Sequence, residues 1–155
     1  MPAMQAAPTI RQAHPADFAA WAALRGQLWP ESDAAAHLAE LGELSRDARF
    51  RGWLALDSAT PVGFAESFIR PFANGCDSRP VAFLEGIWVA PPYRRRRVGG
   101  QLLAAVEHWA GALGIDELGS DADIANALSL LCHGRWGFEE MERVVCFRKR
   151  LGPPG

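Results

Sequence analysis

The alternation of apolar and polar positions divides the chain into short helices and strands. A strand is predicted at residues 9–12. The helix that follows it begins at His14-Pro15-Ala16-Asp17 and ends at Pro30. A second helix, capped by Ser32, extends to Leu44. The first helix is predicted because apolar residues share one of its faces: Phe18, Trp21, Leu24 and Leu28.

The middle of the chain has the pattern of β-structure. Residues 51–56 and 62–69 are predicted strands, and the turn at 57–61 between them makes an antiparallel pair the simplest arrangement. Residues 81–89 are almost continuously apolar, so we expect a central strand that is buried on both faces.

Helical spacing returns after residue 97. Residues 98–113 are predicted to form a helix that Gly114 ends, followed by a strand at 117–120 and a helix at 121–136. Closing strands are predicted at 138–142 and 144–149. The order βααβββαβαββ indicates an α/β fold with a mixed parallel and antiparallel sheet. The apolar positions expected to face inward in the two helices are Val98, Leu102, Val106, Trp109 and Leu113, and then Ile124, Leu128 and Leu131.

Composition limits the classes of protein. A chain of 155 residues, 49% hydrophobic with a net charge of −2, predicts one domain at 9–151, with a disordered leader at 1–8 and tail at 152–155. The near-neutral charge argues against bulk nucleic-acid binding. No apolar run approaches the roughly 20 residues of a membrane span, no metal motif is present, and the three cysteines lack CxxC spacing. We therefore expect a cytoplasmic protein with free thiols and no metal.

The sequence from Trp88 to Leu103 is the most informative part of the chain. An apolar strand leads through a turn that contains four arginines, Arg94 to Arg97, into an amphipathic helix. Free N–H groups at a helix N-terminus and the helix dipole favour a phosphate there. The pattern indicates a small anionic ligand, although a solvated basic turn is the alternative.

Glu85 is the only charged residue in the predicted central strand. A carboxylate in an apolar strand is costly unless it is paired, hydrated or functional. We consider Glu85 the leading candidate for a catalytic base, and a structural carboxylate satisfied by backbone donors or an arginine is the alternative.

Several separated motifs resemble the GCN5-related N-acetyltransferase (GNAT) superfamily. They are the strand Glu85 to Val89, the turn Arg94 to Gly99, Asn126, and the run His133 to Phe138. A closer resemblance, to the aminoglycoside 6′-N-acetyltransferases, rests on Gln27 to Pro30, Asn74 to Ser78, Phe83 to Ile87 and Gly137 to Val144. The element order is similar across nearly the whole chain.

This resemblance implies an enzyme that uses acetyl-CoA to acetylate the 6′-amine of aminoglycosides and thereby confers resistance. An N-acetyltransferase for another small amine or a protein N-terminus is one alternative, since one fold serves many acceptors. A non-catalytic sensor of acyl-CoA is another. The resemblance also implies that residues 142–150 could form a sheet-edge homodimer.

The donor side follows from the same resemblance. Backbone groups of Ile87, Trp88 and Val89 are expected to pair with the pantetheine arm, and Asn126 to reach the cofactor. His133 stands where the superfamily usually has a tyrosine, and it could protonate the departing thiolate or be a structural histidine. The turn residues expected to bind pyrophosphate are Arg94, Arg95, Arg96, Arg97, Val98 and Gly99. Arg97 replaces a usual glycine, so a positive φ there would cost about 1 kcal/mol.

On the acceptor side, Trp29 and Phe72 could form apolar walls for sugar rings, with core packing as the alternative. Glu85, Asp121 and Glu142 would supply negative charge for a polycationic acceptor. Asp121 could equally cap the last helix.

Overall fold

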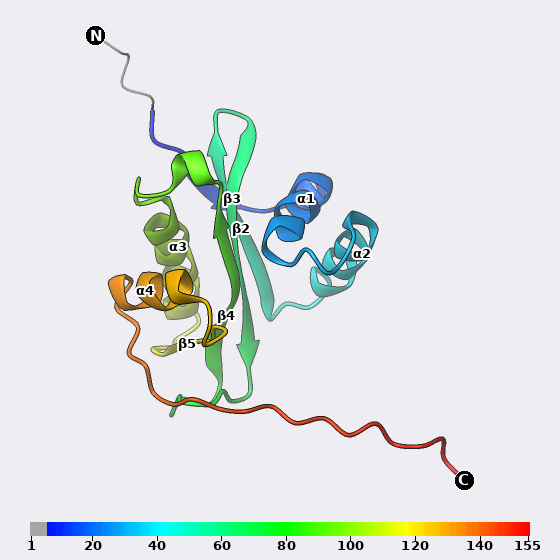
Figure 1. Ribbon diagram of the computed structural model, residues 1–155. Coiled ribbons are helices and arrows are strands. Elements are labelled where there is room, and N and C mark those ends of the chain that lie inside the picture. Colours follow the sequence, from blue (N-terminus) through cyan, green and yellow to red (C-terminus); the bar gives the residue numbers. More distant parts are fainter. Residues whose placement is uncertain (1–5) are drawn as a thin grey trace.

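The computed structural model describes residues 6–155, so most of the leader predicted at 1–8 lies outside the described residues. Helices cover both faces of one sheet: α1 and α2 lie against one face, and α3 and α4 against the other (Figure 1). The elements are β1 (Thr9–Gln12), α1 (Phe18–Leu28), α2 (Ala34–Leu44), β2 (Phe50–Asp57), β3 (Thr60–Arg70), β4 (Val81–Val89), α3 (Val98–Ala112), β5 (Leu118–Ser120) and α4 (Ala127–Arg135).

The strands pair in the order β1-β2-β3-β4-β5. The first four are antiparallel to their neighbours, and β5 is parallel to β4, which confirms the mixed sheet. One core cluster packs the α3 side of the sheet around Leu102 and Val106, and a second packs the α1–α2 side around Trp21 and Phe64. The two cores hold the sheet between two helical layers.

A β-bulge interrupts the pairing of β3 with β4. Glu66 pairs with Gly86 and the next residue, Ser67, pairs with Leu84, so Glu85 is the extra residue with no partner in the register. A bulge bends its strand and changes the direction of the side chain that it carries. The bulge therefore sets Glu85 apart from the regular alternation of β4.

The other edge of β4 is paired over only part of its length. β5 pairs with residues Ala82, Phe83 and Leu84, whereas β3 continues alongside β4 as far as Val89. Within the described chain, the edge of residues 85–89 that faces away from β3 therefore has no strand beside it. This free edge leads directly to the turn before α3.

Two helix caps differ from the sequence prediction. Asp33, rather than Ser32, caps α2, with its side chain accepting the N–H of Ala36. Asn126, rather than Asp121, caps α4 by accepting the N–H of Ser129 at 3.0 Å, because the helix begins only at Ala127. Residues 121–126 instead form a loop beyond the end of β5.

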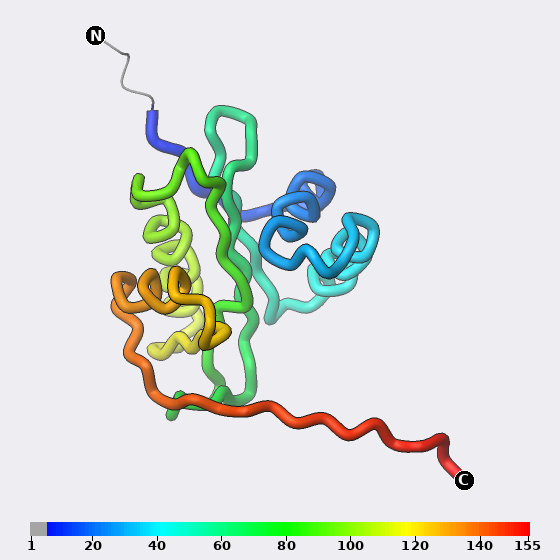
Figure 2. The backbone as a smooth tube through the Cα atoms, viewed as in Figure 1, coloured from blue at the N-terminus to red at the C-terminus, as the bar shows by residue number. Residues whose placement is uncertain are grey.

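The two closing strands predicted at 138–142 and 144–149 are wrong for this structure. Residues 138–155 contain no helix or strand, and Figures 1 and 2 show them running beneath the sheet and away from it. The residue between the two predicted strands is Arg143, which is not one of the residue types, such as Gly, Asn and Asp, that hairpin turns favour. We call residues 138–151 the C-terminal arm.

Apolar side chains of α4 and of the loop before it are exposed. Ile124, Leu128 and Leu131 were expected to face inward, but they are 65%, 57% and 51% exposed. In the described residues, the arm does not fold back over them. Several arm side chains are exposed as well: Met141, Val144, Val145, Phe147 and Leu151.

The described residues include no helix long and apolar enough to cross a membrane. In the same part of the chain, no three His, Cys, Asp or Glu side chains are grouped as a metal site would require. Cys76, Cys132 and Cys146 are all free thiols.

Candidate active site

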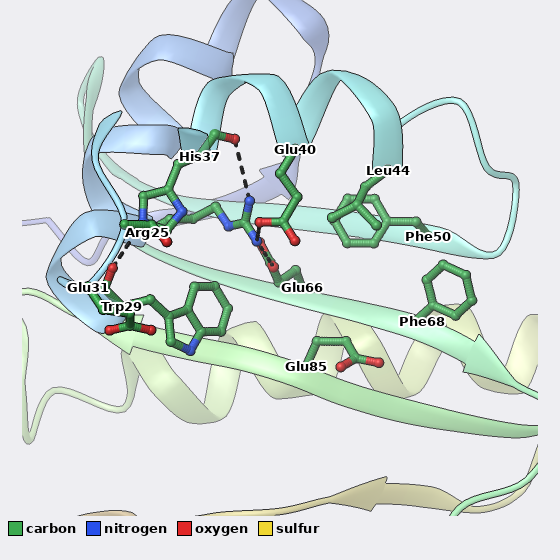
Figure 3. Close-up of a pocket in the computed structure, with 11 residues that line it drawn as sticks. Arg25, Trp29, Glu31, His37, Glu40, Leu44, Phe50, Glu66, Phe68 and Glu85 are labelled. Carbon is green, nitrogen blue, oxygen red and sulfur yellow. Dashed lines mark hydrogen bonds and ion pairs between the residues drawn. The ribbon is translucent and has the colours of Figure 1, made fainter. Parts of the chain in front are cut away.

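A cleft of about 370 Å³ lies between the α1–α2 pair and strands β3 and β4. Figure 3 shows that its side chains come from both helices, from the loop between them and from strands β2, β3 and β4. Four carboxylates are among its lining residues, against one arginine and one histidine. The lining consists of Arg25, Trp29, Glu31, Ser32, His37, Glu40, Leu44, Phe50, Glu66, Phe68 and Glu85.

Glu85 lines this cleft from the bulge in β4, and its carboxylate is paired with Arg70. Nε and Nη2 of Arg70 donate to the two carboxylate oxygens at 2.8 and 2.7 Å, a two-pronged geometry that fixes both groups. The guanidinium carbon also lies 3.6 Å from the centre of the Phe83 ring. The hydrogen bond to Glu85, with attraction from Glu85 and Asp121, raises the pKa of Arg70, so the arginine stays charged.

A second acid, Glu66, forms the buried floor of the cleft. Its side chain is paired with Nη2 of Arg25 at 3.2 Å and accepts the indole N–H of Trp21 at 3.1 Å. Burial raises the pKa of Glu66 from 4.5 to about 7, even though Arg25 and the hydrogen bond from Trp21 act in the opposite direction. The same guanidinium nitrogen of Arg25 reaches Glu40, on the exposed rim, at 2.9 Å. Arg25 therefore links the floor of the cleft to its rim.

Trp29 forms one wall of the cleft, at the C-terminal end of α1. Its ring lies against Gly86, where an added methyl group would be 2.5 Å from Cη2 of the indole. The backbone carbonyl of Trp29 is 3.0 Å from Nε2 of His37. Trp29 and Glu85 are thus the two predicted acceptor residues that the structure brings together in one cleft.

The other predicted acceptor residues lie outside the lining of this cleft. Phe72 is 58% exposed in the loop between β3 and β4, where Arg79 lies over its ring. Asp121 lies just past β5, near enough to Arg70 to attract its charge. Glu142 is exposed on the C-terminal arm. These three residues remain predictions about acceptor binding.

The basic turn leads into α3 with an unusual backbone. Arg97 caps the helix with φ 62° and ψ 12°, and Arg95 has φ 60°, so both side chains are attached to left-handed backbone. Arg97 therefore has the positive φ at which a residue other than glycine is strained. Arg94 folds back and donates from Nε to the carbonyl of Val89 at 2.8 Å, which connects the turn to the end of β4.

Gly99, the last of the residues expected to bind pyrophosphate, also lies against the end of α4. A methyl group at Gly99 would lie 2.8 Å from Cζ2 of Trp136, whereas nothing lies within 4 Å of one at Gly100. The absence of a side chain at Gly99 allows the end of α4 to pack against the start of α3. The phosphate-binding capacity of this turn thus rests on its N–H groups and arginines.

Both ring nitrogens of His133 contact protein groups. Nδ1 lies 2.7 Å from the carbonyl oxygen of Ser129, to which it donates, and Nε2 lies 2.8 Å from the hydroxyl of Ser120. The ring also packs against Trp136 and Phe138, with centroids 5.7 and 5.0 Å apart. This geometry favours the structural alternative for His133, in which it fixes α4 to the end of β5.

Three charged residues were not predicted from the sequence: Arg25 and Glu66, which line the cleft, and Arg70, which pairs with Glu85 at its edge. Glu66 could have been found, because it is the only charge within the predicted strand 62–69, as Glu85 is within 81–89. Arg25 and Arg70 gave no such signal, since a single arginine in a helix or at a strand end is common on protein surfaces. Only the fold shows that each pairs with a carboxylate.

Comparison with known proteins adds a family and relatives. The acetyltransferase (GNAT) family model matches residues 12–138. The aminoglycoside N(6′)-acetyltransferase type 1 of Stenotrophomonas maltophilia is 48% identical over 95% of this chain and 96% of its own length. The protein of the same name from Salmonella enteritidis is 43% identical over 91% of this chain and 98% of its own length. A solved structure of AAC(6′)-Iy with the bisubstrate analogue CoA-S-monomethyl-acetylneamine has a TM-score of 0.89 and 41% identity, covering 94% of this chain and 100% of that one.

Proposed function

The chain belongs to the acetyltransferase (GNAT) family, and from that premise we propose that it transfers the acetyl group of acetyl-CoA to the 6′-amino group of aminoglycoside antibiotics. The acidic cleft beside the free edge of β4 is the observation that carries the proposal. A polycationic acceptor and a polyanionic donor would each meet charge of the opposite sign. The reaction would remove a positive charge from the drug, and resistance would follow.

The donor side has the features that acetyl-CoA requires. Along the edge of β4 that β5 leaves unpaired, backbone groups alternate in direction. Ala90 donates to Val62 of β3, so Trp88 also faces β3, and Ile87 and Val89 face the free edge, where they are suited to an extended amide-containing arm. The same strand ends at the basic turn, where the first N–H groups of α3 and Arg94 to Arg97 would hold the pyrophosphate. Bound acetyl-CoA supplies the activated acetyl thioester.

The acceptor side is the cleft itself. Glu85 is suited to hold or accept a proton of the reacting amine, directly or through water, because its carboxylate lines the cleft at the bulge next to the free edge of β4. Trp29 provides an apolar wall for a sugar ring on the far side of Gly86. Glu31 and Glu40 at the rim add negative charge for the other amines of the drug.

The direct test is to incubate the purified protein with acetyl-CoA and kanamycin, to follow CoA release and to locate the acetyl group by NMR. Acetylation of the 6′-amine is the expected result. Release with a polyamine or a peptide N-terminus but not with any aminoglycoside would support the alternative acceptors. Binding of acetyl-CoA without release of CoA for any amine would instead favour a sensor.

We further propose that the protein is a homodimer in which each C-terminal arm packs on the other copy. The exposed apolar residues of the arm and the exposed face of α4 are two surfaces that water disfavours, and a second copy provides a partner for each. The arm is anchored in its own chain by Met141, which packs against Gly75, and continues beyond it as an extended segment. Extended segments are stabilised by pairing with another strand, and β5 has a free edge.

Light scattering of the full chain tests this proposal. We expect a dimer, and we expect the double substitution Val145→Asp and Phe147→Asp to give a monomer, because both side chains are exposed in the single chain and would be covered in the dimer. Arg148→Asp, a charge change on the same arm, is the control that should remain dimeric. A monomeric wild-type chain would contradict the proposal.

A further inference from the structure

The ion pair between Arg70 and Glu85 is too exposed to be explained by stability alone. The side chains are 37% and 27% exposed, and ion pairs of this kind contribute little to folding. Yet the guanidinium is held along one edge by both oxygens of Glu85 and on one face by the ring of Phe83. An arrangement this well defined at the edge of the cleft points to a role in the reaction.

The reaction proposed above creates a conflict at Glu85. The acceptor amine must be neutral when it attacks the thioester, but most aliphatic amines are protonated near neutral pH. A free carboxylate beside the amine would stabilise its ammonium form and so hold the proton in place. A positive charge next to the carboxylate weakens that effect without removing the proton acceptor.

We propose that Arg70 is a positioning residue that fixes the Glu85 carboxylate and offsets its charge, so that a bound acceptor amine loses its proton more readily. The proposal rests on the proposed function and adds a residue to it. The two N–H donors of Arg70 occupy one lone pair on each oxygen, and each oxygen keeps another for the amine or a water molecule. Glu85 can therefore be paired with Arg70 and still accept a proton.

Other charged groups around the cleft also influence the amine. They stay the same in every variant below, so a difference between variants reports the charge at position 70. Glu66 is the most important of them, because its pKa of about 7 falls in the range of the measurement. The groups are Arg25 on α1, Glu31 in the loop after it, His37 and Glu40 on α2, Glu66 on β3 and Asp121 beyond β5.

The test compares Arg70→Met, which removes the charge, with Arg70→Lys, which keeps the charge but loses the two-pronged contact. Acetyl transfer to kanamycin is measured between about pH 6 and pH 9, and kanamycin binding is measured by calorimetry with CoA present. Arg46→Met is the matched control, because Arg46 is an exposed arginine in the turn after α2, outside the lining of the cleft, and pairs only weakly with Glu43.

For Arg70→Met we expect the acidic limb of the profile of kcat against pH to move up by about one pH unit. We also expect kanamycin to bind about fivefold more tightly, because the carboxylate is no longer neutralised. For Arg70→Lys the acidic limb stays at the wild-type pH while kcat falls, since the charge is kept and the fixed orientation is lost. Arg46→Met should behave as the wild type.

Two results would overturn the inference. One is an equal loss of rate at every pH in Arg70→Met with unchanged kanamycin affinity, which would indicate a purely structural arginine. The other is an equal shift of the acidic limb in both variants, which would show that the charge is not responsible. If the wild type acetylates no aminoglycoside, the proposed function itself is wrong. The activity of the wild type thus separates failure of the proposed function from failure of the inference about Arg70.

Discussion

Oε1 of Glu66 lies 3.2 Å from Nη2 of Arg25, and both side chains are almost completely buried beneath the cleft. Removing two charges from water is costly, and a single ion pair seldom repays the full cost. The contacts around this pair are also incomplete, since Nε of Arg25 and Nδ1 of His37 have no hydrogen-bond partner in the described structure. Glu66 consequently has a pKa raised to about 7.

This raised pKa predicts how stability depends on pH. The folded state binds the proton of Glu66 more tightly than the unfolded state, whose value is near 4.5, so the contribution of Glu66 is greatest below that pH and is lost as the pH rises to about 7. Glu66→Gln should remove this loss of stability, which is on the order of 3 kcal/mol. Urea unfolding at several pH values measures it.

Glu43→Gln provides the control, because Glu43 is 77% exposed on α2 and its ion pair with Arg46 is long. Its stability should follow pH as the wild type does. If Glu66→Gln kept the wild-type slope, the buried carboxylate would not be the group responsible.

The contact between Gly86 and Trp29 predicts a second effect, on the acceptor. Gly86→Ala would place a methyl group 2.5 Å from the indole and force the ring out of position. We expect kcat/KM for kanamycin to fall by about tenfold while the KM for acetyl-CoA stays the same. Gly111→Ala, with open space around its position in α3, should leave both unchanged. A parallel loss for both substrates would place the damage outside the acceptor cleft.

Arg97 predicts a third effect, on stability. Its φ of 62° is a conformation that glycine adopts without cost, so Arg97→Gly should stabilise the fold by about 0.5 to 1 kcal/mol despite the added freedom of the unfolded chain. Arg96→Gly should destabilise the fold, because Arg96 is not among the residues with positive φ and glycine there only adds freedom to the unfolded chain. Thermal unfolding of both variants compares them. Equal destabilisation would show that the turn at Arg97 is not strained.

The interior of the sheet could be predicted from sequence because burial leaves a pattern. The strand at 81–89 has the same bounds in the structure as in the prediction, since an almost unbroken apolar run has few other conformations. The helix before Gly114 was predicted for a similar reason, and Gly114 ends it with φ 75°. Both elements are buried within one chain, so their own sequence is sufficient to predict them.

The end of the chain could not be predicted in this way. The apolar residues of 138–149 resemble strands, but a strand forms only where another pairs with it, and within the described chain no strand pairs with these residues. The site shows a similar limit. Glu85 stands out as a lone charge in its strand, whereas the bulge that directs it and the pairing with Arg70 arise from a neighbouring strand.

The contacts of His133 predict a fourth effect. His133→Phe would remove the bonds to Ser129 and Ser120, so stability should fall by about 1 to 3 kcal/mol. The alkaline limb of the profile of kcat against pH should remain in place, because the ring nitrogens are engaged within the protein. Denaturation and a pH profile measured on the same preparation separate the two. Loss of the alkaline limb with normal stability would assign His133 to protonation of the thiolate.

The most direct test of the account is the rate of kanamycin acetylation by Glu85→Gln, measured together with its affinity for acetyl-CoA. Gln keeps the size of the side chain and one acceptor oxygen but cannot hold the proton of the amine. We expect kcat to be lower by about 100-fold or more, with acetyl-CoA affinity within about twofold of the wild type, since the donor side rests on the edge of β4 and on the basic turn. An unchanged kcat would show that acetyl transfer does not take place beside Glu85.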